Sequence, residues 1–224
     1  MTQTAAKPDI ASLRRRIEAL AVGRPQGASP RLALGPAPID AALGGGLDPH
    51  ALHEAAGAGA RAFAAGLAGR LEGPVVWVAH DRQEAQLYPS GMKEAGLNPE
   101  NIIFVSVPAA EVAWAFEQAL RSGAAATAVA EAARLPDFTQ SRRLQLAARE
   151  GRALALLLAM DRRARRLPAS AADTRWRVTP RPAAGPGAPP RYRLDLQKNK
   201  KGSTRIWEVE WHAPSHRFHL AAAL

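Results

Sequence analysis

Residues 54–63 read EAAGAGARAF, a glycine-rich stretch that follows a short apolar segment and precedes an alanine- and leucine-rich run. A strand, a glycine loop and a helix in that order form the phosphate loop of nucleotide-binding proteins. There, backbone N–H groups surround the phosphates, a lysine contacts the β and γ oxygens, and a hydroxyl group ligates Mg²⁺. The stretch therefore has to be tested for ATP chemistry.

The side chains that would hold a nucleotide are absent at the required spacing. Counting the pattern G-x-x-x-x-G-K-[ST] from Gly57 places Ala62 at the second glycine, Phe63 at the lysine and Ala64 at the hydroxyl. A missing lysine removes a Coulomb attraction of about 4 kcal/mol at 4 Å in a partly screened site. Arg61 lies two residues before the lysine position, so it is no direct substitute. We expect a strand–turn–helix connection without a bound nucleotide.

Other reactive side chains give weaker signals. His212, His216 and His219 are close in sequence, but the chain has no cysteine and the spacing does not put three ligands on one strand face. Ser90 lacks the context of a hydrolase nucleophile. We therefore predict neither a metal nor a cofactor.

Positive charge is concentrated in the C-terminal part. Residues 1–139 hold 12 Lys/Arg and 14 Asp/Glu (net −2), and residues 140–224 hold 18 and 6 (net +12). Such asymmetry indicates a polyanion or acidic protein partner, whose contacts would weaken with salt. An arginine-rich solvated surface or hairpin tip is the alternative. The candidate residues for binding DNA or a partner are Arg162, Arg163, Arg165, Arg166, Lys198, Asn199, Lys200, Lys201 and Arg205.

The N-terminal segment reads as an amphipathic helix followed by a Pro/Gly/Ser-rich linker, over residues 1–30. Leu13, Ile17 and Leu20 recur at helical spacing, with Arg14 beside them. This helix could dock on a neighbouring subunit or partner, which would give self-association, or fold back on its own core.

Elements of alternating type must position these residues. Apolar runs predict buried strands, and amphipathic segments between them predict helices, which indicates an α/β fold with a mainly parallel sheet covered on both faces. Period-two alternation after residue 173 predicts an antiparallel extension of the sheet. Residues 82–96 read as helical in part, with a break at Pro89. The expected strands are 51–55, 74–79, 101–107, 127–131, 153–159, 173–181, 190–198, 204–211 and 216–220.

The domain organisation follows from these elements. We expect one domain over 31–220, with a basic region at 161–205 and a short tail at 221–224. No signal peptide and no membrane span are visible, and the absence of cysteine agrees with a reducing compartment. The expected location is the cytoplasm.

The segment LGPAPIDAALGGGLDPHALHEAAG resembles the entry to the RecA/RadA recombinase fold. The resemblance implies a RecA-like sheet and puts Glu131 at the acid that normally holds Mg²⁺. It also matches Lys198, Asn199 and Lys200 to a turn that reaches the ATP of the next subunit. The degenerate loop (Gly57, Arg61–Ala64) implies that the ATPase chemistry is missing.

Within this fold the chain resembles the ImuA family, through LALGPAPIDAALGGGL, ALRSGA, TQSRRLQLAAREG, SAADTRWRV and WEVEWHAPSHRF. The resemblance implies a role in the SOS response and in error-prone translesion DNA synthesis. The implied partners are ImuB, a Y-family-like protein, and a DnaE-type polymerase, at damaged DNA of the nucleoid. Two alternatives remain: a residual DNA-dependent ATPase that binds nucleotide through Arg61, and a SulA-like inhibitor of the division protein FtsZ.

Overall fold

The computed structural model describes residues 31–80, 88–160 and 168–221. The predicted N-terminal helix with Leu13, Arg14, Ile17 and Leu20 lies outside the described residues. So do the predicted DNA- or partner-binding residues Arg162, Arg163, Arg165 and Arg166, and also residues 81–87 and 222–224.

A single nine-stranded sheet organises the chain, in the order β3-β2-β4-β5-β1-β6-β7-β8-β9. The pairs from β3 to β6 are parallel, and those from β6 to β9 are antiparallel. This confirms the mainly parallel sheet with an antiparallel extension. The strands are β1 (Leu52–Ala56), β2 (Val75–His80), β3 (Ile102–Val107), β4 (Thr127–Ala132), β5 (Leu154–Ala159), β6 (Thr174–Arg181), β7 (Arg191–Asn199), β8 (Arg205–His212) and β9 (Arg217–Leu220).

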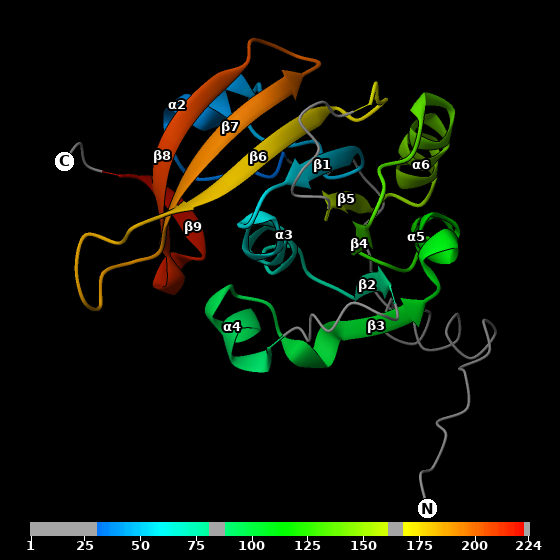
Figure 1. Ribbon diagram of the computed structural model, residues 1–224, viewed down its shortest axis with the longest axis horizontal. Helices are drawn as coiled ribbons and strands as arrows, with labels where there is room; N and C mark the ends of the chain where they lie inside the picture. Colours follow the sequence, from blue (N-terminus) through cyan, green and yellow to red (C-terminus); the bar gives the residue numbers. More distant parts are fainter. Residues whose placement is uncertain (1–30, 81–87, 161–167, 222–224) are drawn as a thin grey trace, which may run out of the picture.

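Helices cover both faces of the parallel half (Figure 1). One face carries α3 (Ala60–Ala68) and α4 (Pro89–Glu94), and the other carries α5 (Val112–Arg121) and α6 (Phe138–Glu150). The short α2 (Ala37–Ala42) packs against the antiparallel strands, on the α3 side of the sheet. Three 3₁₀ turns, Pro99–Asn101, Ala109–Glu111 and Ala213–Ser215, join elements.

The core has two apolar clusters, one on each face. The cluster on the α3 side is rich in large side chains, including Phe63, Trp77 and Trp176, all at most 1% exposed. The cluster under α5 and α6 is mostly alanine, valine and leucine. β1, β4 and β5 are buried along their whole length. Only β5 is an uninterrupted apolar run, since β1 buries His53 and Glu54 and β4 buries Glu131.

The segment 82–96, predicted as helical in part, contains a helix that begins at Pro89, and residues 82–87 lie outside the described residues. α4 starts at Pro89, with Tyr88 as its extended N-cap. Proline fits this first position because its missing N–H would have no partner in the first turn, and its φ is already helical. Within the part of the chain that the structure describes, no helix combines the length and the hydropathy needed to span a bilayer.

Candidate functional site

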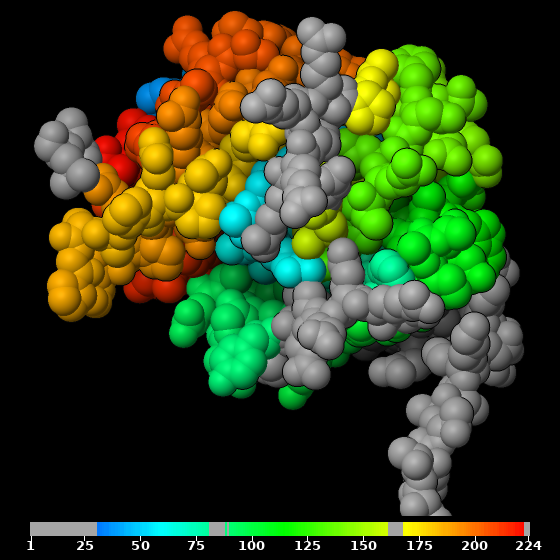
Figure 2. Space-filling view, in the orientation of Figure 1, coloured from blue at the N-terminus to red at the C-terminus, as the bar shows by residue number. Residues whose placement is uncertain are grey.

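The glycine loop lies where the resemblance places it, between β1 and α3, at the edge where the parallel strands end. Its surface (cyan in Figure 2) is visible between the orange C-terminal strands and the green lower part of the molecule. Glu131 lies near the end of β4, two strands away from β1 in the sheet. The topology therefore brings the loop and the predicted acid to one edge.

The loop is closed against β6. Gly59 donates its backbone N–H to the carbonyl oxygen of Val178, at 3.1 Å. Gly57 has φ of +97°, and a Cβ there would lie 2.5 Å from the same oxygen. One of the amides that a phosphate loop would turn toward its ligand is thus already bonded within the protein.

Phe63, at the lysine position, points into the core. Its ring centroid lies 5.6 Å from that of Trp176 and 5.9 Å from that of Phe218, and the side chain is 1% exposed. Ala64 is fully buried, whereas Ala62 is exposed. None of these three side chains presents a charge or a hydroxyl group to the loop.

Arg61 forms an ion pair with Glu131, the residue that the resemblance puts at the position of the Mg²⁺-holding acid. Its Nε donates to Glu131 Oε1 at 2.8 Å, and its NH2 donates to Glu131 Oε2 at 2.6 Å. Trp77 Nε1 also donates to Oε1, at 3.1 Å. The Glu131 side chain is fully buried, and that of Arg61 is 33% exposed. Bidentate pairing of this kind is the strongest geometry for an arginine and a carboxylate.

The Lys-Asn-Lys turn between β7 and β8 is bonded to its own chain. The ammonium of Lys200 donates to Ala171 O at 2.6 Å and to Asp173 Oδ1 at 2.9 Å. Lys198 donates to the carbonyl oxygen of Ser170. Asn199 Nδ2 donates to Ala42 O at 2.9 Å, which ties the turn to α2. Their predicted role in binding DNA or a partner stays a prediction.

Burial lowers the pKa of Lys198, and the neighbouring ammonium of Lys200 lowers it further. The other two cations of the turn lie nearer the solvent: Lys201 Nζ is 3.7 Å from Asp48 Oδ2, and Arg205 is exposed. These two side chains are the better placed for an external anion.

A buried ion pair beneath this turn was not predicted from the sequence. Arg175 Nε donates to Glu54 Oε2 at 2.6 Å, and Ser170 donates to the other carboxylate oxygen. The pair ties β6 to β1 and to the segment before β6. The alternation of TRWRV puts Arg175 on the face opposite Trp176, but nothing in it identifies Glu54 as the partner.

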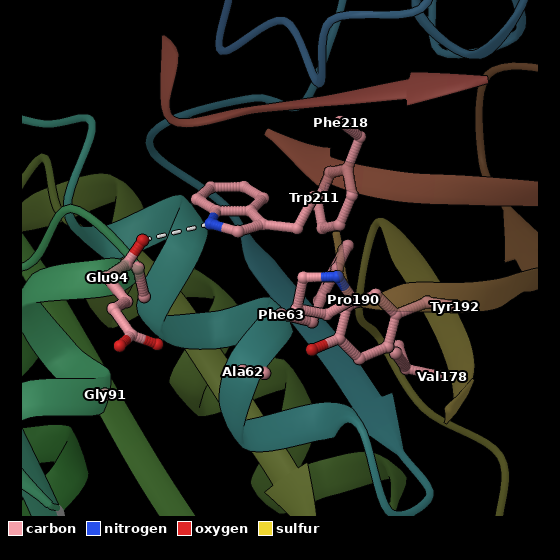
Figure 3. A pocket seen from close by; sticks show the side chains of 10 residues that line it. Ala62, Phe63, Gly91, Glu94, Val178, Pro190, Tyr192, Trp211 and Phe218 are labelled. Atoms are coloured by element: carbon pink, nitrogen blue, oxygen red, sulfur yellow. Dashed lines mark hydrogen bonds between the residues drawn. The ribbon is translucent and has the colours of Figure 1, made fainter. Parts of the chain in front are cut away.

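A pocket opens beside the loop, between α3, α4 and the antiparallel strands (Figure 3). Its volume is about 90 Å³. Ala62 and Phe63 line it from α3, and Glu94 from α4. Tyr192 and Trp211 line it from β7 and β8. Burial raises the pKa of the Tyr192 hydroxyl.

The histidines near the C-terminus form a pair rather than a three-ligand cluster. The rings of His212 and His219 lie 4.8 Å apart, and Ser215 Oγ is 2.7 Å from His212 Nδ1. Among residues 31–80, 88–160 and 168–221, no group of three or more His, Cys, Asp or Glu side chains is arranged to hold a metal ion.

Comparison with known proteins bears on the fold and the family. No protein-family model matches the chain. The crystal structure of the RadB recombinase superposes with a TM-score of 0.57 at 16% identity, covering 81% of this chain and 96% of that one, which shows the fold alone. Protein ImuA of Caulobacter vibrioides, from strains NA1000 / CB15N and ATCC 19089 / CIP 103742 / CB 15, is 33% identical over 226 residues. This match covers 88% of this chain and 91% of the relative. The chain therefore belongs to the ImuA family.

Proposed function

We propose that this ImuA-family protein is a non-catalytic, RecA-like adaptor in SOS-induced, error-prone translesion DNA synthesis. In this proposal it works in the cytoplasm, at damaged DNA of the nucleoid. It assembles there with an ImuB-like Y-family protein and a DnaE-type error-prone polymerase. The observation that carries the non-catalytic part is the bidentate pair between Arg61 and Glu131.

That pair places a cation where an ATPase of this fold holds Mg²⁺. A metal would have to separate two charge-assisted hydrogen bonds to a carboxylate that no solvent reaches, and the guanidinium would repel it. The Gly59–Val178 bond and the inward direction of Phe63 support the same conclusion, because they remove one of the amides and the cation that would hold the phosphates.

Family membership and the charge of the C-terminal 85 residues support the adaptor part of the proposal. Their net charge of +12 suits a partner that carries phosphates or carboxylates. Contacts to phosphates would supply affinity without sequence preference, as a protein that acts wherever a lesion stalls synthesis requires.

The test is fluorescence anisotropy of labelled single-stranded DNA with the purified protein, over a salt series, with and without Mg-ATP. The proposal expects binding that weakens steeply with salt and ignores Mg-ATP. Binding that responds to Mg-ATP would instead favour a residual DNA-dependent ATPase. A parallel FtsZ polymerisation assay tests the SulA-like alternative, for which we expect no inhibition.

A further inference from the structure

The pocket between α3, α4 and the antiparallel strands, here called the α3–α4 pocket, lies beside the closed loop and shares Ala62, Phe63 and Val178 with it. Its volume of about 90 Å³ is room for several water molecules, since one water needs about 10–15 Å³ on this measure, and it admits the end of one side chain. It is open to solvent beside the exposed Ala62.

The walls of the α3–α4 pocket are apolar and aromatic. In Figure 3, Trp211 lies above the space, and Tyr192 and Pro190 lie on one side of it. Trp211 Nε1 donates to the backbone oxygen of Glu94 at 3.1 Å, which fixes the indole ring against α4. The fixed ring makes this a preformed pocket rather than one that a ligand must open.

One acidic side chain lies at this apolar pocket. Glu94 is exposed, and its carboxylate lies on the side of the pocket opposite Tyr192 (Figure 3). It makes no hydrogen bond or ion pair with any residue in the part of the chain that the structure describes. Among the cations that stand next to lining residues in the sequence, Lys93 is exposed on α4, Arg61 is bonded to Glu131, and Arg191 is paired with Glu210.

We infer that the α3–α4 pocket binds an arginine or lysine side chain of a partner protein. Such a side chain has an apolar stem that the walls would bury, and a cationic head that Glu94 would pair with. Aromatic rings attract cations through their faces, and the planar guanidinium of arginine both stacks on them and meets a carboxylate with two hydrogen bonds. A neutral apolar side chain would offer the exposed Glu94 no counter-charge, and a phosphate would be repelled by it.

This inference deepens the adaptor proposal and rests on it for the existence of a protein partner. The probe is the indole N–H NMR signal of Trp211 in the full chain, assigned with Trp211→Phe. The titrants are acetyl-arginine amide, acetyl-lysine amide and acetyl-leucine amide. We expect the two cationic amides to shift the signal, arginine at the lower concentration, and the leucine amide to leave it in place.

Glu94→Gln keeps the size of the side chain and removes its charge. We expect it to raise the apparent Kd for the arginine amide at least fivefold, whereas the matched control Glu100→Gln, outside the pocket, leaves it unchanged. Ala62→Leu, which fills the pocket from an exposed site on α3, should abolish the shift.

Three results would overturn the inference. The first is a leucine amide that shifts the signal as strongly as arginine does, and the second is an unchanged affinity in Glu94→Gln. The third is a Trp211 signal that already moves in the triple variant Arg14→Ala/Arg15→Ala/Arg16→Ala before any amide is added. That result would make the chain's own N-terminal segment the occupant. Because DNA and Mg-ATP are absent from this assay, its failure would leave the adaptor proposal standing.

Discussion

At the scale of single residues, the pair of Arg61 and Glu131 replaces a ligand with a protein contact. Arg61→Met leaves a fully buried carboxylate with Trp77 as its one remaining hydrogen-bond donor among the described residues. We expect a loss of about 3 kcal/mol in the free energy of unfolding, because the charge stays buried after its partner is removed. Urea denaturation measures it.

The double variant Arg61→Met/Glu131→Met is the control for that prediction. We expect it to be more stable than Arg61→Met alone, since no uncompensated charge remains. A single variant as stable as the parent protein would mean that the pair contributes nothing to the fold.

Protonation of His53 should make the free energy of unfolding depend on pH in the acid range. The His53 side chain is buried, and its Nε2 lies 2.9 Å from Asp48 O, so Nε2 carries the proton and Nδ1 accepts from Thr174 Oγ1 at 2.8 Å. Burial lowers its pKa below 6.5, against the opposing effects of the Asp48 carbonyl and the Asp173 charge. The unfolded chain therefore binds the proton first, and stability falls as pH drops below 6.5.

The expected loss from this group is at most about 1.4 kcal/mol per pH unit, until the folded pKa is reached. Thermal unfolding between pH 7.5 and 5 in the parent protein and in His53→Gln measures it. We expect a shallower acid slope in the variant. Equal slopes would assign the acid sensitivity to other groups.

At the scale of elements, the closeness of the glycine loop to β6 decides whether the loop can open. Gly57→Ala would place a Cβ 2.5 Å from the Val178 oxygen at a φ of +97°, whereas at Gly44, with φ of +68°, a Cβ meets nothing within 4 Å. We expect Gly44→Ala to cost about 1 kcal/mol from its left-handed backbone, and Gly57→Ala at least twice that. Chemical denaturation of both variants tests this, and equal costs would mean that β6 can move away from the loop.

Sequence patterns were enough for the order and type of the elements, because apolar runs and period-two alternation are local signals. The contacts that define the site are not local. Arg61 and Glu131 are 70 residues apart, and Glu54 and Arg175 are 121 apart, so only the folded sheet reveals them. The sequence shows which residues of a phosphate loop are missing. It does not show that Arg61 pairs with Glu131.

The side-chain orientation of Lys198 differs from the one that strand alternation predicts, because the pairing of β6 with β7 is irregular. Alternation places Leu196 and Lys198 on one face of β7. The register instead shifts beside Arg175 and Trp176, so that Leu196 faces Trp176 and Lys198 faces Arg175. This β-bulge turns Lys198 to the opposite face, where Ser170 accepts its hydrogen bond. The sequence alone does not mark the bulge.

At the scale of the whole molecule, the separation of charge along the chain predicts where a nucleic acid would bind. Arg162, Arg163, Arg165 and Arg166 lie in the part with a net charge of +12, and Arg14, Arg15 and Arg16 in the part with −2. Alanine at all four positions of the first cluster should weaken binding of single-stranded DNA uniformly across sequences. If each arginine contacts one phosphate, the slope of log K against log salt should fall by about 3.

Alanine at Arg14, Arg15 and Arg16 is the matched control, since it removes a similar charge from the other part of the chain. We expect nearly unchanged affinity and slope, because exposed charges more than about 8 Å from the nucleic acid are screened at physiological salt. Anisotropy titrations from 50 to 300 mM salt measure both variants. Equal losses in the two would mean that binding follows net charge rather than a defined surface. A loss confined to the N-terminal variant would move the DNA contact to that segment and leave the basic C-terminal part for protein partners.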